Sequence, residues 1–188
     1  MEMPLLLPPS ATSQHTGAEL VGNDPEFDRF FLRHYDGLVR SLTAITGDRE
    51  RADDCVQEAF IRAFARWRRI RRYDNPATWV RRVAINLSRD ADRSEKRRRR
   101  REDNDRMGEA RGAESSVDAV AADLYLVDLL QRLTQQQRVV AALFYIEDIS
   151  VAEIAESLGL TTGAVKFHLN KARGGLKSML ESEEARSV

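Results

Sequence analysis

The chain has 188 residues, and its 30 basic and 30 acidic side chains give a formal net charge of zero. Charged residues make up 32% of the composition, whereas glycine, proline and alternating β-branched segments are sparse. This composition predicts an all-α protein with one domain or two small ones. A single cysteine excludes a disulfide framework and suits a reducing cytoplasm. No apolar segment reaches membrane-spanning length, so we expect no contact with a membrane.

The first helical domain is expected over residues 23–95, after a leader of residues 1–22 that is rich in Pro, Ser and Thr and is predicted to be disordered. Asn23 or Asp24 can cap its first helix. The apolar side chains of this helix recur at helical spacing: Phe27, Phe30, Phe31, Tyr35, Leu38 and Leu42. Gly47 and Asp48 then break the pattern.

The second predicted helix has the most regular pattern in the chain. Its apolar positions follow the spacing of one helix face: Ala52, Cys55, Val56, Ala59, Phe60, Ala63, Phe64 and Trp67. Cys55 is therefore interpreted as an unreactive core thiol. The other face carries four polar side chains: Asp53, Asp54, Gln57 and Glu58. DNA phosphates would repel these carboxylates, so the face is either solvated or a protein-binding surface, and periodicity alone favours neither.

A strongly basic region follows. The segment from Arg68 to Pro76 is predicted as a loop that ends in a turn signal before a third helix. The inward side of that helix carries Trp79, Val80, Val83, Ala84 and Leu87, and a second face presents Arg82, Asn86, Arg89 and Arg93. From Arg62 to Arg101, sixteen Lys or Arg stand against four Asp or Glu, which favours a phosphate-binding surface. Tyr73 and Asn75 are suited to stack on, or hydrogen-bond to, an unpaired base.

Residues 96–122 are predicted to form a linker that is basic from Lys96 to Arg101 and acidic afterwards. From Glu102 to Asp128, eight acidic residues stand against two basic ones. The acidic part has no apolar period and is expected to be flexible. Charge segregated in this way indicates separate surfaces for separate partners.

The second helical domain is expected over residues 123–182. Two helices are predicted first, from the apolar positions Leu124, Val127, Leu130 and Leu133, and then Val139, Val140, Leu143, Phe144 and Ile146. Residues 150–177 have the pattern of a helix-turn-helix, which places its second helix in the DNA major groove.

The helix-turn-helix pattern is supported at each local step. Ser150 and Glu153 have capping-box spacing, Gly159 can adopt the left-handed conformation of the turn, and Thr161 can cap the second helix. The inward stripe of that helix is Val165, Leu169, Ala172 and Leu176. Its candidate DNA-contacting residues are Thr161, Thr162, Lys166, Phe167, Asn170, Lys171 and Arg173.

The sequence contains no recognisable catalytic constellation. The three histidines, His15, His34 and His168, are scattered and have no metal-ligand spacing with Cys55. There is no glycine-rich phosphate loop and no nucleophile elbow. We therefore expect a protein that is not an enzyme and that has neither a metal nor a cofactor.

Three segments, in this order, resemble the extracytoplasmic-function (ECF) sigma factors of bacterial RNA polymerase. They are Arg51 to Phe64, Asn75 to Asp90 with the basic residues that follow, and Leu133 through Ser150 to Arg173. The likeness extends over roughly residues 26–180. The order of the segments and the polar linker between them make the resemblance specific.

The resemblance implies a role for each surface. The polar face of Asp53, Asp54, Gln57 and Glu58 would dock on the clamp helices of the polymerase β′ subunit. The region from Arg71 to Asn86, with Arg89 and Arg93, would recognise and open the −10 promoter element as single strands. The helix-turn-helix would bind the −35 element as duplex DNA and touch the β flap. An anti-sigma factor is implied as a further partner.

The chain departs from the family pattern at a few positions. Thr134 and Gln135 stand where a proline is usual, and Thr134 can cap the helix instead. Phe167, His168 and Asn170 replace small and basic residues on the recognition helix, which leaves the preferred −35 sequence open. Gly174 and Gly175 are expected to weaken that helix by about 1 kcal/mol each relative to alanine.

Two other functions fit parts of the sequence. A stand-alone helix-turn-helix regulator would need a sensor domain, and residues 23–95 show neither a ligand-pocket nor a phosphoacceptor pattern. A helical RNA-binding protein would use the arginine-rich segment but would leave the helix-turn-helix unexplained. A sigma factor with two all-α domains explains every segment.

Overall fold

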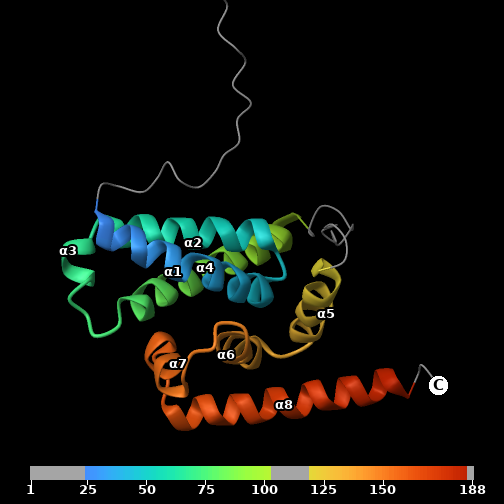
Figure 1. The fold of residues 1–188 in the computed structure, drawn as a ribbon. Helices are drawn as coiled ribbons and strands as arrows, with labels where there is room; N and C mark the ends of the chain where they lie inside the picture. The colour runs from blue at the N-terminus through green and yellow to red at the C-terminus, as the bar shows by residue number, and fades with distance from the viewer. Residues whose placement is uncertain (1–23, 103–118, 186–188) are drawn as a thin grey trace, which may run out of the picture.

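A computed structural model of the protein describes residues 24–102 and 119–185, in which eight helices and no strands occur. The helices are α1 (Pro25–Thr46), α2 (Arg49–Phe64), α3 (Trp67–Ile70), α4 (Pro76–Glu102), α5 (Ala119–Gln131), α6 (Gln135–Tyr145), α7 (Val151–Leu158) and α8 (Thr162–Glu184). Helices α1 to α4 form one layer, and α6 to α8 form a second layer below it, with α5 at one side (Figure 1). The expected all-α fold is confirmed.

Side-chain caps set the boundaries of the first two helices. The Asp24 carboxylate accepts hydrogen bonds from the backbone N–H groups of Glu26 and Phe27, at 3.0 and 3.3 Å. Gly47 has φ 75°, a left-handed conformation that ends α1, and Asp48 caps α2 by accepting from the Arg51 N–H. The predicted break between the two helices is confirmed.

An aromatic cluster holds α1, α2 and α3 together. The Phe27 ring lies 5.2 Å from Trp67 and 6.4 Å from Phe60, in edge-on geometry in both cases. Phe30 lies 4.9 Å from Trp67. Each of these contacts joins residues of different helices, so the cluster fixes the angle between them. Cys55 of α2 is buried, as expected, and burial raises the pKa of its thiol.

The sequence interpretation is wrong at the end of α2. Phe64 was expected in the core but is 41% exposed, and Trp67 belongs to the separate helix α3 rather than to α2. The expected loop from Arg68 therefore starts inside a helical turn. The turn forms because it buries both Trp67 and Ile70, which are 5% and 1% exposed.

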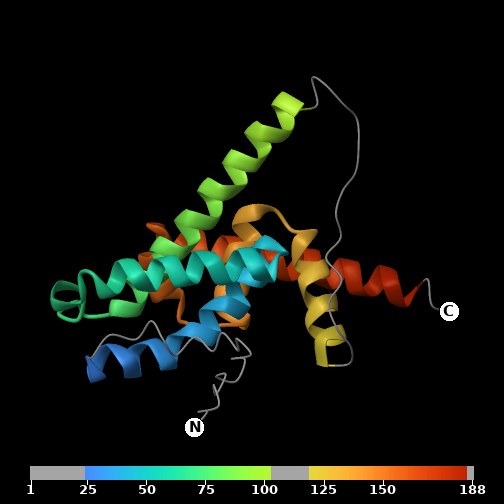
Figure 2. The ribbon, with the colours of Figure 1, turned by 90° about the horizontal axis from the view of Figure 1, so that it is seen from above.

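Helix α4 is longer than the sequence suggested. It includes the basic segment to Glu102 that was assigned to the linker, and its end projects away from the rest of the molecule (Figure 2). Ion pairs between neighbouring turns support it, Arg93 with Asp90 at 3.4 Å and Arg98 with Glu95 at 2.9 Å. Residues 119–122, also assigned to the linker, lie in α5. The acidic residues 103–118 of the predicted linker and the leader of residues 1–22 lie outside the described residues.

The helix-turn-helix has the predicted local chemistry. The Ser150 hydroxyl accepts from the Glu153 N–H at 3.2 Å, and the Glu153 carboxylate accepts from the Ser150 N–H at 3.0 Å. Gly159 has φ 65°, and the Thr161 hydroxyl accepts from the Ala164 N–H at 3.1 Å. Val165, Leu169 and Ala172 are buried and Leu176 is partly buried.

Helix α8 continues through Gly174 and Gly175 to Glu184, two residues beyond the expected domain end. At Gly175 a Cβ atom would lie only 3.1 Å from Cδ2 of Leu133, a residue that is 5% exposed. The missing side chain therefore lets α8 approach the α5–α6 turn closely. This contact explains one of the two glycines that the sequence shows only as a helix weakness.

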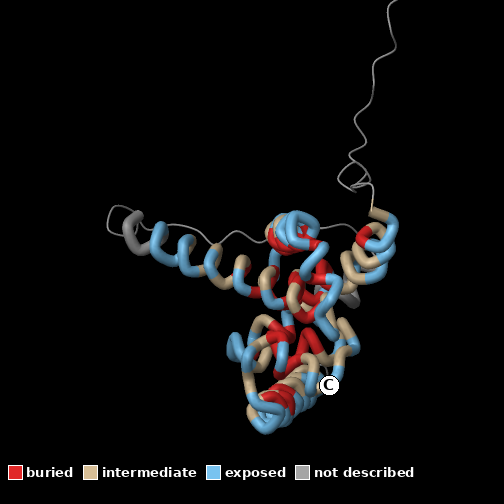
Figure 3. Tube along the Cα trace, turned by 90° about the vertical axis from the view of Figure 1, so that its left-hand side faces the viewer, coloured by how far each residue is buried: buried red, intermediate tan, exposed pale blue. Residues whose placement is uncertain are grey.

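The two layers share one continuous hydrophobic core. Helix α1 packs against α5 and α6, and α4 packs against α7. Buried residues concentrate along the centre, where the layers meet, whereas the far part of α4 is exposed (Figure 3). The side chains in this contact decide how the candidate functional surfaces are displayed.

The capping box gives a stability prediction. Ser150→Ala should lower the free energy of unfolding by about 1 kcal/mol, because it removes both hydrogen bonds of the Ser150 hydroxyl, one accepted from the Glu153 N–H and one donated to the Glu153 carboxylate. The Ser150 bonds lower the pKa of Glu153 below its ordinary value of 4.5. The stability that the ionised Glu153 carboxylate gains from these bonds is therefore present above about pH 4.5. It is lost as the pH falls through the pKa of Glu153 in the folded protein.

Thermal melting of wild type and Ser150→Ala at pH 7 and at acidic pH measures this effect. The difference in melting temperature between wild type and Ser150→Ala should become smaller at acidic pH. Ser182→Ala, in the last turns of α8, is the control and should lower the melting temperature less than Ser150→Ala at pH 7. Equal melting of wild type and Ser150→Ala at pH 7 would contradict the assignment.

Candidate polymerase and nucleic-acid interfaces

The polar face of α2 divides into one internally bonded carboxylate and three outward side chains. Asp53 is half-buried and accepts hydrogen bonds from the Tyr35 hydroxyl and the Gln57 amide, both at 2.7 Å. Burial and the Asp53 bond raise the pKa of Tyr35 to about 12. Asp54 and Gln57 are exposed, and Glu58 pairs with Arg62 at 2.7 Å near the surface. The surface offered to a partner is thus formed by Asp54, Gln57 and Glu58, with Asp53 holding Gln57.

Two exposed apolar side chains extend this surface. Ile61 and Phe64 are 48% and 41% exposed and follow Gln57 and Glu58 by three to seven residues along α2. That spacing puts them on the same side of the helix. Sequence analysis assigned Phe64 to the core and overlooked Ile61, although Ile61 lies outside the apolar stripe. A polar surface with an apolar extension has the composition of a protein-binding interface.

The candidate −10 residues of the α3–α4 loop are spread over different environments. Arg71 pairs with Glu26 at 2.9 Å, and Tyr73 is 37% exposed. The Asn75 side-chain oxygen accepts from the Thr78 N–H at 3.3 Å, which fixes Asn75 at the start of α4. Its amide nitrogen donates to Glu153 of α7 at 2.8 Å. Asn75 is therefore bound to the helix-turn-helix rather than free.

The candidate residues on α4 form one row, as predicted, but they differ in availability. The Arg82 guanidinium donates to the backbone carbonyls of Glu156 and Ser157 at the end of α7, the latter at 3.2 Å. Asn86 and Arg93 are exposed, and Arg89 is half-buried, where desolvation lowers its pKa. Arg82 thus interacts with the second domain, and the other three residues of the row face solvent.

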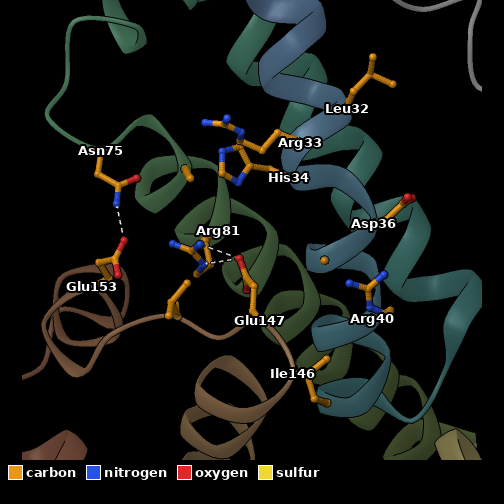
Figure 4. A pocket seen from close by; sticks show the side chains of 13 residues that line it. Leu32, Arg33, His34, Asp36, Arg40, Asn75, Arg81, Ile146, Glu147 and Glu153 are labelled. Atoms are coloured by element: carbon orange, nitrogen blue, oxygen red, sulfur yellow. Dashed lines mark hydrogen bonds and ion pairs between the residues drawn. The ribbon is translucent and has the colours of Figure 1, made fainter.

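Sequence analysis missed the most buried charged pair. The Arg81 side chain is 3% exposed and donates to Glu147 through Nε and Nη2, at 2.8 and 2.6 Å (Figure 4). Ser41 of α1 also donates to Glu147, at 3.2 Å. The sequence did contain one indication that Arg81 would be buried. Arg81 lies four residues after Ala77 and three before Ala84, which puts it on the inward side of an amphipathic helix.

The candidate −35 residues are all exposed along the outward side of α8. These are Thr161, Thr162, Lys166, Phe167, Asn170, Lys171 and Arg173. Phe167 is 57% exposed, and the Lys171 ammonium lies 5.8 Å from its ring centroid. Arg173 Nε donates to the Tyr145 hydroxyl at 2.6 Å, so α6 orients this guanidinium. The candidate residues therefore form an exposed surface on the second helix of the motif.

The described residues contain no group of three or more side chains that could hold a metal ion. In the same parts of the chain, no helix is both long and apolar enough to cross a membrane.

Comparison with known proteins identifies both halves of the chain. Residues 30–99 match the family model "Sigma-70 region 2", and residues 123–174 match "Sigma-70, region 4". RNA polymerase sigma-E factor of Streptomyces avermitilis is 30% identical over 85% of this chain and 87% of its own length. ECF RNA polymerase sigma factor SigL of Mycobacterium tuberculosis is 32% identical over 77% of this chain and 82% of its own length.

Solved structures give the same result. The sigma factor RpoE of Bartonella quintana, in complex with the anti-sigma factor NepR, covers 84% of this chain and 98% of its own with a TM-score of 0.71 at 18% identity. CnrH, in complex with the cytosolic domain of CnrY, covers 86% of this chain and 91% of its own with a TM-score of 0.63 at 25% identity. The chain belongs to the ECF sigma factors, and it is an RNA polymerase sigma factor for transcription initiation.

Proposed function

We propose that this sigma factor divides promoter recognition between two surfaces and docks on core polymerase through a third. The outward row of α4, with Tyr73 and Asn75, acts on the −10 element. The exposed side of α8 binds the −35 element, and α2 binds the β′ clamp helices. The protein supplies recognition and strand opening in the cytoplasm, while the polymerase core performs the catalysis.

The observation that carries this proposal is the reading face of α8. Seven candidate side chains are exposed along one helix that is capped at Thr161 and supported by α7. In a helix-turn-helix, the first turns of the second helix meet the base edges. Asn170 can pair with adenine, and Phe167 can contact a thymine methyl group.

The surface of α2 is acidic and apolar, unlike the basic surfaces of α4 and α8, and this composition supports a protein partner for α2. Asp54 and Glu58 carry negative charge, which phosphates repel, and Ile61 and Phe64 add exposed apolar surface. The two rival functions, a stand-alone regulator and an RNA-binding protein, leave this surface unexplained. They also do not account for the matched order of sigma regions 2 and 4.

We also propose an anti-sigma factor as a partner. Support comes from RpoE and CnrH, since each of these similar structures was solved as a complex, that of RpoE with its anti-sigma factor. No residue of this chain identifies the partner.

Charge reversal tests the α2 surface. Glu58→Lys should weaken binding to core polymerase at least tenfold, because it places like charges against each other in the interface. Thermal melting should change little, since Glu58 pairs only with Arg62 near the surface. Glu181→Lys on α8 is the control, as it reverses the charge of another surface glutamate that pairs within its own helix, outside α2. Unchanged core affinity of Glu58→Lys would contradict the assignment.

Three alanine variants test the division between the DNA surfaces. Asn170→Ala should lose discrimination at one −35 base pair by roughly 1–3 kcal/mol, because a base-edge contact is removed. Lys171→Ala should weaken binding evenly across sequences and lower the salt slope by about one unit. Asn86→Ala should leave −35 binding intact and slow promoter opening.

The measurement uses holoenzyme with duplex and pre-opened promoters that carry single base changes. Arg40→Ala, on the exposed side of α1, is the control for loss of a basic side chain outside the three surfaces. If Asn170→Ala relaxes no −35 position while Asn86→Ala does, the roles of the two domains are reversed.

A further inference from the structure

The contact between the two domains is built around one buried ion pair. Arg81 of region 2 and Glu147 of region 4 are 3% and 9% exposed and meet through two hydrogen bonds. Glu147 lies between α6 and α7 and packs beside Gly37 of α1, where a Cβ would be in ordinary van der Waals contact with its Cγ, at 3.9 Å. Ser41 and Ser157 complete the polar surroundings of the pair.

A second set of contacts joins the end of α1 to the second domain. Gln131 donates to the backbone carbonyls of Ala44 and Ile45, at 2.9 and 3.3 Å. Arg138 donates to the Ile45 carbonyl at 3.1 Å. These carbonyls have no partner within α1, because they belong to its last turn. The second domain therefore satisfies groups that water would otherwise satisfy.

The apolar core that the two layers share favours the closed arrangement, whereas the polar part of the interface can be rehydrated when the domains separate. Its hydrogen bonds join charged or amide side chains to carboxylates and backbone carbonyls, all of which water can solvate after separation. A groove of about 490 Å³, bordered by His34, Arg40 and Ile149, reaches the ion pair from outside (Figure 4). A buried pair that regains full hydration on separation contributes little net stability, but removal of one partner leaves a costly unpaired charge.

The same contact engages two candidate −10 residues. Asn75 donates to Glu153, and Arg82 donates to the carbonyls at the end of α7. In contrast, the outward side chains of α8, including Lys166 and Asn170, remain exposed. The arrangement thus covers part of one DNA surface and leaves the other accessible.

Geometry shows that this arrangement cannot read both promoter elements at once. The −10 and −35 elements lie about 25 base pairs apart, roughly 85 Å at 3.4 Å per base pair. A compact chain of this length has a radius of gyration of only about 16 Å. Simultaneous recognition therefore requires the domains to separate.

We propose that the Arg81–Glu147 ion pair holds the free protein in a closed state in which the helix-turn-helix domain covers Asn75 and Arg82. The −35 reading face stays open in that state. The covering of a −10 surface rests on the proposed function, whereas the closed state itself does not. Because Asn75 and Arg82 are engaged in the closed state, single-stranded −10 DNA should bind the open state more tightly, so closure lowers its apparent affinity.

The closed state is tested by the distance between two spin labels on the full chain. The labels are attached on the two sides of the groove, at Leu32→Cys on α1 and at Ala152→Cys on α7 beside Glu153, in a Cys55→Ser background; both sites are exposed. Wild type should give one short distance, and Glu147→Gln should give longer, broader distances, since the Arg81 charge is then unpaired when closed. Glu183→Gln removes a charge that bonds Tyr125 and Arg132 inside the second domain and should leave the distance unchanged.

A double variant separates opening from unfolding. Arg81→Met with Glu147→Leu replaces the pair by apolar groups and should restore the short distance. Melting curves of all variants confirm that both domains remain folded. An unchanged distance in a folded Glu147→Gln protein would overturn the proposal, as would a wild type that is already open.

The functional arm uses two DNA probes without polymerase: a single-stranded −10 oligonucleotide and a −35 duplex, with sequences taken from the holoenzyme assay. Glu147→Gln should bind the single strand at least about fivefold more tightly than wild type and the duplex equally. If Glu147→Gln gives longer label distances but does not bind the single strand more tightly, the claim that the second domain covers the −10 surface is wrong. Failure of wild-type holoenzyme to initiate at promoters would instead contradict the proposed function.

Discussion

The buried contact between Arg81 and Glu147 fixes how the two domains sit against each other. Two charged groups leave water to make it. Their mutual hydrogen bonds, the bond that Ser41 donates to Glu147 and the bond that Arg81 donates to Ser157 have to offset that cost. The pair positions the start of α4 against α7. The orientation of Asn75 and Arg82 towards the second domain follows from that position.

The rest of the fold depends on local signals that each domain carries for itself. Asp24, Asp48, Ser150 and Thr161 satisfy the free N–H groups at helix starts, and Gly47 and Gly159 end helices in the left-handed conformation. The aromatic cluster around Phe27 and Trp67 joins the first three helices. Because these devices act within one domain, separation of the domains leaves them intact, and each reading surface keeps its shape.

Much of this architecture could be predicted from the sequence. Helix periods and caps are local, so the all-α fold and the helix-turn-helix were expected with nearly the correct boundaries. The inward stripe of α8 and the outward row on α4 were also expected, because burial follows helical spacing. The errors occur where tertiary contacts decide the outcome. Trp67 and Ile70 form α3 because their burial stabilises a single helical turn. Gly175 is accommodated in α8 because Leu133 packs closely against the position that a Cβ would occupy. Arg81 and Glu147 lie 66 residues apart, and no local pattern connects them.

The account combines a closed free protein with an extended, promoter-reading one, so the direct test is to follow one molecule between these states. The doubly labelled wild-type chain should give a short interdomain distance alone and a much longer one after it binds core polymerase and promoter DNA. That lengthening, together with initiation at the promoter, is the result that the account predicts. A holoenzyme that initiates at the promoter while the short distance persists would contradict it.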